Sequence, residues 1–208
     1  VAFAIRKKYK TEIIGLDLSV NMLERAKQKS KKYKIDDISF IEGDAENLPF
    51  NDNTFDKLVI SYGLRNLGNP EIGLREFYRV LKPGGRLVLA DFFVKNEYTC
   101  NQEPYIQKWR DCWAMAELPS TSGFKDRLNA CSFDEIEIRD FTDKIRPTAR
   151  RMYKAYLLGA IPSKAYNLVF NASPFSRKHY KSGLYQYKAL KKGLWNYIII
   201  SAVKPNVI

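Results

Sequence analysis

Short apolar runs alternate with helical or polar segments along the first half of the chain. Runs at 12–19, 38–45 and 55–61 each close near an acidic or small polar residue. This alternation predicts successive strands of a parallel sheet, whose carboxyl ends share one edge. We therefore expect an α/β fold with a doubly wound, mostly parallel sheet and a ligand cleft at that edge.

Helix signals fill the intervals between these runs. Ser19 is placed to cap a helix over 20–33, and Asn69 is placed to cap one over 70–81, with a proline in its first turn. A Lys-Pro-Gly-Gly turn then leads into a buried strand at 86–93.

The second half of the chain predicts more helices and two further strands. The expected elements are helices at 102–116 and 122–131, a strand at 135–140, helical and loop material over 142–193, and a last strand at 194–203. We interpret the chain as a single domain over 1–208. Its expected parts are a core at 1–141, a basic lid or insertion at 142–193 and a closing strand at 194–208.

The composition is that of a folded globular protein, with 45% hydrophobic and 28% charged residues among 208. No apolar run approaches the ~18 residues that a membrane span needs, and no signal-peptide pattern is present. We therefore expect a cytoplasmic protein. The three cysteines have neither CxxC nor Cys/His ligand spacing, so we expect no disulfide framework and no metal site.

Nearly all of the formal charge of +12 comes from residues 142–193. This segment contains one acidic residue, Asp143, and twelve basic residues interleaved with eight aromatic ones. The pattern suits an anionic membrane surface, RNA or a phosphate-bearing substrate, and it also fits a solvated lid whose tyrosines pack inward. We expect peripheral membrane contact through this segment. Nucleic acid is disfavoured, because no single-strand-binding motif is present.

Two aspartates close the first two predicted strands. A carboxylate at Asp17 is placed to accept both hydroxyls of a ribose, and one at Asp44 is placed to accept from an exocyclic amine or a ring N–H. Met22 and Leu23 lie near the same edge, where they either belong to the core or flank an adenine ring. Together these residues predict a nucleoside site without phosphate recognition.

Five blocks of residues occur in a recognisable order and spacing. They are Gly15–Ser19 with Met22 and Leu23, Gly43–Phe50, Asn53–Asp56, Ser61–Asn66 and Arg79–Leu87. In these blocks the sequence resembles the class I S-adenosylmethionine-dependent methyltransferases over about residues 1–95. Within that superfamily it is most similar to the ubiquinone/menaquinone-biosynthesis C-methyltransferases and their relatives acting on tocopherol precursors and sterols.

The resemblance implies a Rossmann-like fold, S-adenosylmethionine as the cofactor, and a role for each matching residue. Asp17 binds the ribose hydroxyls, and Arg65 with Asn66 faces the acceptor. The full set of cofactor-binding residues that it implies is Asp17, Leu18, Met22, Asp44, Ala45, Ser61 and Tyr62.

The sequence departs from the family pattern in two places. The family's first strand and glycine-rich loop would precede Val1, and without them we expect a broken fold and no cofactor binding. The strand after the Gly-Gly turn continues with Asp91-Phe92-Phe93, where the quinone enzymes usually have Glu-x-Ser. From Asn96 onward the chain is more similar to general small-molecule and lipid methyltransferases, so quinol, phenol, sterol-like and natural-product acceptors all stay open.

Methyl transfer from a sulfonium is an in-line displacement in which positioning supplies much of the rate. A carbon or phenol acceptor must also lose a proton, so a general base helps. The candidates are Tyr62, His179 and Asp91. His179 also fits a solvated surface group, and Asp91 also fits a partly buried structural acid.

We therefore predict an S-adenosylmethionine-dependent methyltransferase acting on a small, lipophilic or aromatic acceptor. One alternative is an RNA or protein methyltransferase that uses the basic segment. Another is a non-catalytic nucleoside-binding module. The sequence predicts no particular oligomeric state.

Overall fold

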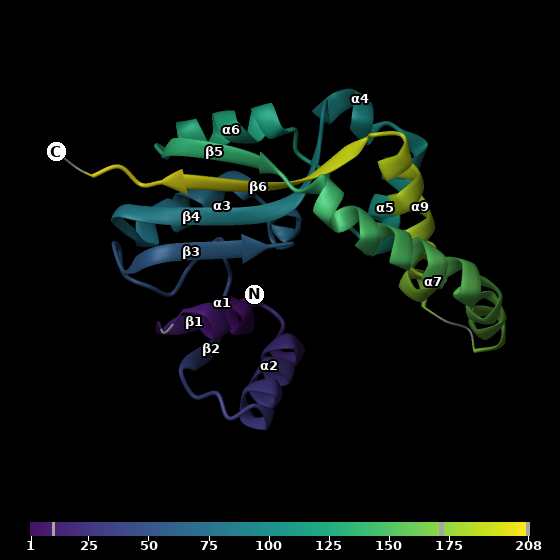
Figure 1. The fold of residues 1–208 in the computed structure, drawn as a ribbon, viewed down its shortest axis with the longest axis horizontal. Helices are drawn as coiled ribbons and strands as arrows, with labels where there is room; N and C mark the ends of the chain where they lie inside the picture. The colour runs from purple at the N-terminus through teal and green to yellow at the C-terminus, as the bar shows by residue number, and fades with distance from the viewer. Residues whose placement is uncertain (10, 171–172, 207–208) are drawn as a thin grey trace.

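A computed structural model of the chain describes residues 1–9, 11–170 and 173–206 (Figure 1). In chain order its elements are α1 (Ala2–Lys8), β1 (Ile13–Asp17), α2 (Val20–Lys32), β2 (Ile38–Glu42), β3 (Phe55–Ser61), the 3-10 turn η1 (Leu64–Asn66), α3 (Pro70–Val80), β4 (Leu81–Val94), α4 (Glu97–Asn101), α5 (Pro104–Trp113), α6 (Thr121–Ala130), β5 (Asp134–Asp140), α7 (Thr142–Val169), α8 (Pro174–His179), α9 (Ser182–Lys191) and β6 (Trp195–Val203).

The strands form two sheets. β1 and β2 pair in parallel, and the other four strands form a second sheet in the order β3-β4-β6-β5. Within the described residues no strand joins β1 to β3. Figure 1 shows the β1–β2 unit, with α1 and α2, below the larger sheet.

The expected α/β class is confirmed, with a larger sheet of mixed direction. β3 and β4 are parallel, whereas β6 runs antiparallel to both of its neighbours, β4 and β5. The last strand therefore does not close the sheet at its edge, because it inserts between two earlier strands. Register pairing sets Asp91 opposite Ile198 and Phe92 opposite Tyr197.

Both predicted helix caps are confirmed. The Ser19 hydroxyl accepts a hydrogen bond from the backbone N–H of Met22, and the Asn69 carbonyl oxygen accepts from those of Glu71 and Ile72. These polar side chains satisfy N–H groups that the first helical turn leaves unpaired.

Several predicted boundaries were wrong. The helix expected at 102–116 is the shorter α5, which begins at Pro104 and ends at Trp113, and a separate short helix, α4, ends before this stretch at Asn101. Helix α3 ends at Val80, and α6 begins at Thr121. The Lys-Pro-Gly-Gly turn lies inside β4 as a bulge, since the pairing with β3 jumps from Leu81 to Arg86 and Gly84 has φ +74°.

The core has two connected parts. One lies between the larger sheet and helices α3 and α6, and it includes Leu74, Phe77, Leu89 and Phe124. The other surrounds the amino end of β6, where Trp195 packs with residues of α5 and α9. The second part anchors the helices of residues 142–193 to the sheet.

Residues 142–193 are largely helical, as the sequence predicts. Helix α7 packs along α9, and Figure 1 shows its far end extending away from the sheet. Pro147 and Pro162 both lie inside α7. None of the described helices combines the length and the apolar content of a membrane-spanning segment.

Candidate functional site

Asp17 and Asp44 lie exposed after the parallel strands β1 and β2. In each, Oδ1 accepts a backbone N–H two residues further on, from Ser19 and from Glu46, at 2.9 Å in both cases. These local bonds orient the carboxylates and leave Oδ2 of each without a bond to a described residue. The remaining lone pairs fit the hydroxyls of a ribose and the N–H groups of a base.

Apolar side chains flank Asp17. Leu18 is 65% exposed and Met22 is 52% exposed, although both are large and hydrophobic. Leu23, by contrast, is buried against the sheet side of α2. Leu23 therefore belongs to the core, whereas Met22 is exposed, and its packing against an adenine ring stays a prediction.

The loop after β2 is tied to the loop after η1. The carboxylate of Glu46 accepts hydrogen bonds from the backbone N–H groups of Gly68 and of Asn69, the latter at 3.1 Å. This link holds the Asp44–Ala45 segment beside the loop that carries Arg65 and Asn66. These hydrogen bonds connect the loop after β2 with the loop that follows β3 and η1.

Tyr62 follows Ser61 at the end of β3 in a left-handed conformation, with φ +59°. Its backbone N–H donates to the carbonyl of Ala90, and its ring centroid lies 5.6 Å from that of Phe92 and 5.4 Å from that of Tyr197. Burial, together with a hydrogen bond to the Tyr197 side chain, raises the pKa of the Tyr62 phenol. Tyr62 is therefore protonated at neutral pH, and its phenol can donate a hydrogen bond. Its role as a base stays a prediction.

Arg65 is fixed from two sides. Its Nη1 donates to Oδ1 of Asp91 at 3.1 Å, and its guanidinium carbon lies 5.1 Å from the ring centroid of Tyr62 and 5.2 Å from that of Phe92. Asn66 donates to the carbonyl of Tyr62 at 3.4 Å. The predicted acceptor-side residues therefore lie together with Tyr62 in one cation–π cluster.

Asp91 is 1% exposed. Its Oδ1 also accepts the backbone N–H of Phe92, and its Oδ2 has no hydrogen-bond partner among the described residues. Burial raises the pKa of this carboxyl, and the charge of Arg65 opposes that shift. The geometry suits a group that orients Arg65.

The sequence matches the ubiE/COQ5 methyltransferase family over residues 1–155. The chain belongs to this family. Among its relatives, the demethylmenaquinone methyltransferase of Staphylococcus haemolyticus (strain JCSC1435) is 51% identical over 149 residues, which cover 63% of this chain and 62% of the relative. That of Paenarthrobacter aurescens (strain TC1) is 41% identical over 112 residues, 52% of this chain and 39% of the relative. The chain thus spans between about a third and two thirds of the length of such relatives.

Solved structures agree on the fold of this ubiE/COQ5 family member. The [4+2]-cyclase SpnF superposes with a TM-score of 0.79 at 21% identity, covering 99% of this chain and 70% of that one. Geranyl diphosphate C-methyltransferase from Streptomyces coelicolor A3(2) gives 0.73 at 14% identity, covering 98% and 66%. At these identities the likeness shows the fold alone, and it confirms the predicted methyltransferase architecture.

His179 of this ubiE/COQ5 family member lies elsewhere, on α8. Its Nδ1 is 3.2 Å from the carbonyl oxygen of Cys112, and its ring packs against Trp113 and Phe175. None of its contacts within the described ranges reaches Tyr62 or Asp91. Its role as a base stays a prediction, which its position on α8 does not favour.

The sequence patterns did not indicate that Tyr197, Trp109 and Trp195 pack around Phe92. Phe92 packs edge-on against Trp109 and Trp195, at centroid distances of 4.9 and 5.0 Å, and it also contacts Tyr197. Trp195 and Tyr197 are two residues apart on a strand, so they face the same side. That alternation is visible in the sequence, but only the pairing of β4 with β6 places it beside Tyr62.

Proposed function

We propose that this protein transfers a methyl group from S-adenosylmethionine to a small, lipophilic or aromatic acceptor of the quinol or phenol type. The observation that carries the proposal is the hydrogen bond from the Asn69 N–H to Glu46, which ties the loop of the exposed Asp44 to the loop that follows Arg65 and its aromatic cluster. The naming of similar chains as demethylmenaquinone methyltransferases supports the quinol class.

The residues present fit the nucleoside part of the cofactor. Asp17 would accept the ribose hydroxyls, Asp44 with Ala45 would hold the amine side of the adenine, and Leu18 and Met22 would cover the ring. Ser61 and Tyr62 would line the methionine end. When bound, S-adenosylmethionine supplies an electrophilic methyl group on a sulfonium.

On the acceptor side, Arg65 would hold the oxygen of an acceptor that has lost its proton to solvent water. Only Nη1 is engaged by Asp91, and the guanidinium has further N–H donors that make no hydrogen bond within the described residues. Tyr62 donates from its protonated phenol, and Phe92 and Tyr197 form apolar walls that exclude water. Asp91 orients the guanidinium, since its own carboxylate is out of reach of solvent.

We also propose that the protein works in the cytoplasm and meets its acceptor at a membrane surface through residues 142–193. A prenylated quinol resides in the lipid phase, so the enzyme gains by approaching it there. The twelve basic residues of this segment support contact with anionic lipid.

The test measures transfer of a tritiated methyl group from S-adenosylmethionine with a demethylated prenylnaphthoquinol, RNA or protein as acceptor. The chain is assayed alone and joined to the part of the Staphylococcus haemolyticus relative that precedes its match. We expect organic-extractable label from the joined protein. Label in RNA or protein would favour the alternative acceptors, and calorimetry without cofactor binding by a folded joined protein would favour the non-catalytic module.

A further inference from the structure

The far half of helix α7 exposes a stripe of large apolar residues. Leu158 is 83% exposed, Ile161 is 82% exposed and Leu168 is 85% exposed, and Leu157 and Val169 are also exposed. At ~100° per residue these five positions fall within an arc of about 120° on one side of the helix. We name them the α7 tip.

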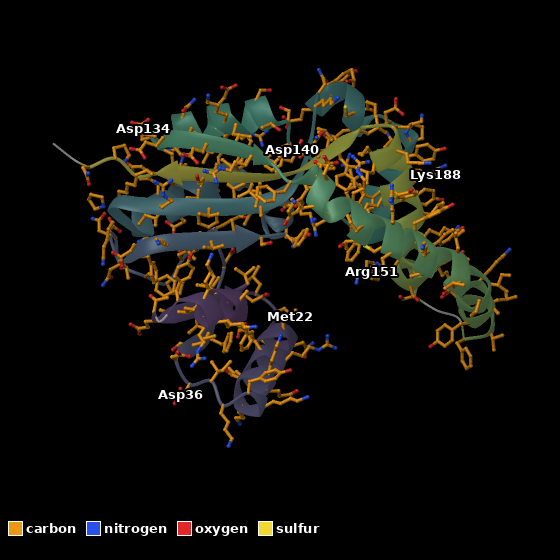
Figure 2. The ribbon with its side chains drawn as sticks, in the orientation of Figure 1. Met22, Asp36, Asp134, Asp140, Arg151 and Lys188 are labelled. Carbon is orange, nitrogen blue, oxygen red and sulfur yellow. The ribbon has the colours of Figure 1, made fainter. Side chains whose placement is uncertain are left out.

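Basic residues precede the tip on the same side of the helix. Arg150, Arg151 and Lys154 are exposed, and the helical period sets them within the same arc. They lie one to two turns before Leu158, or about 6–12 Å along the axis. Figure 2 shows Arg151 on the part of α7 nearer the sheet, with the helix continuing beyond it. We name these three residues the basic collar.

The rest of the segment adds no negative charge near this face. Asp143 is the last acidic residue of the sequence, so every charged side chain after it is positive. Two copies of the α7 tip packed in parallel would bring two collars together and repel. An anionic surface is the complementary partner.

The opposite side of α7 is already packed. The ring of Tyr153 stacks on that of Tyr187 of α9 at 4.8 Å between centroids, and Tyr156 stacks on Tyr180 at 6.3 Å. These contacts confirm that tyrosines of the segment pack inward. They also show which side of the helix faces α9, and the described part of the chain leaves the α7 tip exposed.

We propose that the α7 tip inserts into the boundary between headgroups and acyl chains of an anionic bilayer, with the basic collar against the lipid headgroups. The tip and the collar share one face of α7, so a helix lying in the interface can bury the apolar side chains while the basic side chains reach the headgroups. This inference rests on the membrane contact proposed above, and it adds the lipid class, the inserting residues and the orientation. It does not depend on methyl transfer.

The experiment is co-sedimentation of the 208-residue chain with vesicles of phosphatidylcholine alone or with 30 mol% phosphatidylglycerol. We expect binding to the anionic vesicles that weakens as salt rises from 50 to 500 mM, because screening shortens the reach of the collar charges. In the variant Leu158→Trp, dibrominated phosphatidylglycerol should quench the fluorescence of the new tryptophan more strongly than that of the native tryptophans.

Two matched pairs of variants locate the contact. Arg150→Gln/Arg151→Gln/Lys154→Gln should lower the partition coefficient by about 100-fold. Lys31→Gln/Lys32→Gln/Lys34→Gln removes as many exposed charges from the end of α2 and should change it by less than about threefold. Leu158→Ser/Ile161→Ser should lower it by at least about tenfold, whereas the exposed pair Ile72→Ser/Tyr98→Ser should not.

Several results would overturn the proposal. One is the absence of binding to anionic vesicles at 50 mM salt by a chain whose circular dichroism shows it folded. Another is an equal loss in the collar and α2 variants, which would indicate net charge alone. Self-association removed by Leu158→Ser/Ile161→Ser would assign the tip to a second copy, and collar-dependent binding of single-stranded RNA in place of vesicles would assign it to nucleic acid. None of these readouts involves activity, so failure here leaves the methyl-transfer test unaffected.

Discussion

Arg65 on η1 and Asp91 on β4 form an ion pair of 3.1 Å in which the side chains are only 13% and 2% exposed. Removing one partner of a buried pair leaves the other charge uncompensated, at a cost of about 3–5 kcal/mol. We expect Asp91→Ala to lower the free energy of unfolding by about 3 kcal/mol in urea titrations.

The control for this prediction is Asp143→Ala. Asp143 pairs with Arg146 at 2.9 Å, but its side chain is 89% exposed, so its loss should change stability by less than about 0.5 kcal/mol. Equal effects of the two substitutions would show that the Arg65–Asp91 pair is not held as tightly as its burial indicates.

Asp17→Ala should weaken cofactor binding. In the protein joined to the N-terminal part of its relative, losing the acceptor of two hydroxyl groups should raise the Kd for S-adenosylhomocysteine by about 10- to 100-fold, as measured by calorimetry. Asp36→Ala serves as the control, because it also removes one negative charge but from the loop before β2. Figure 2 shows Asp36 well apart from Met22. That variant should bind as the unaltered protein does; a Kd unchanged by Asp17→Ala would refute the ribose assignment.

Glu76 should make the free energy of unfolding depend on pH. Its carboxylate accepts from Nε and Nη2 of Arg79, both at 2.7 Å, and from the backbone N–H of Leu48 at 2.7 Å. The hydrogen bonds with Arg79 lower the pKa of Glu76 below its ordinary 4.5. A carboxyl with a lowered folded pKa stabilises the protein above its unfolded pKa, and that contribution disappears as pH falls through the folded value.

We therefore expect Glu76→Gln to cost about 1.5 kcal/mol at pH 7 and progressively less as the pH is lowered below 4.5. Urea unfolding of both proteins at pH 7, 5 and 3.5 measures the difference. Glu24→Gln, at the exposed pair with Lys27, serves as the comparison and should show little effect at any pH. A Glu76→Gln difference that stayed constant down to pH 3.5 would contradict the assignment.

Lys204 is a buried anchor for the C-terminal end of β6. Its Nζ donates to Oδ1 of Asn53 at 2.8 Å and to the carbonyls of Tyr78 and Leu81 at 3.0 and 2.8 Å, and burial lowers its pKa. Lys204→Met keeps the length of the side chain but leaves these acceptors unpaired. It should lower the free energy of unfolding by about 2–3 kcal/mol.

Lys95→Met provides the comparison for Lys204→Met, because Lys95 is exposed. Its effect should stay within about 0.5 kcal/mol. Thermal and urea unfolding measure both. If the two lysines proved equivalent, Lys204 would be a surface residue in solution.

The sequence by itself determined the features that depend on neighbours in the chain. Alternating apolar runs specified β1, β2 and β3, and the caps at Ser19 and Asn69 fixed where α2 and α3 begin. Asp17 ends β1 and Asp44 follows β2 because strand ends are set locally. The order of the five residue blocks was enough to indicate the family that the comparisons confirm.

The tertiary structure alone decided which distant residues meet. Arg65 and Asp91 are 26 residues apart, and Lys204 reaches the carbonyl of Leu81 across 123 residues. Three further features depend on pairing and burial across the whole fold. They are the insertion of β6 between β4 and β5, the contact between the rings of Tyr62 and Tyr197, and the outward face of α7. Local sequence cannot specify these, because the free energy that selects them comes from desolvation and contacts that exist only once the sheet has formed.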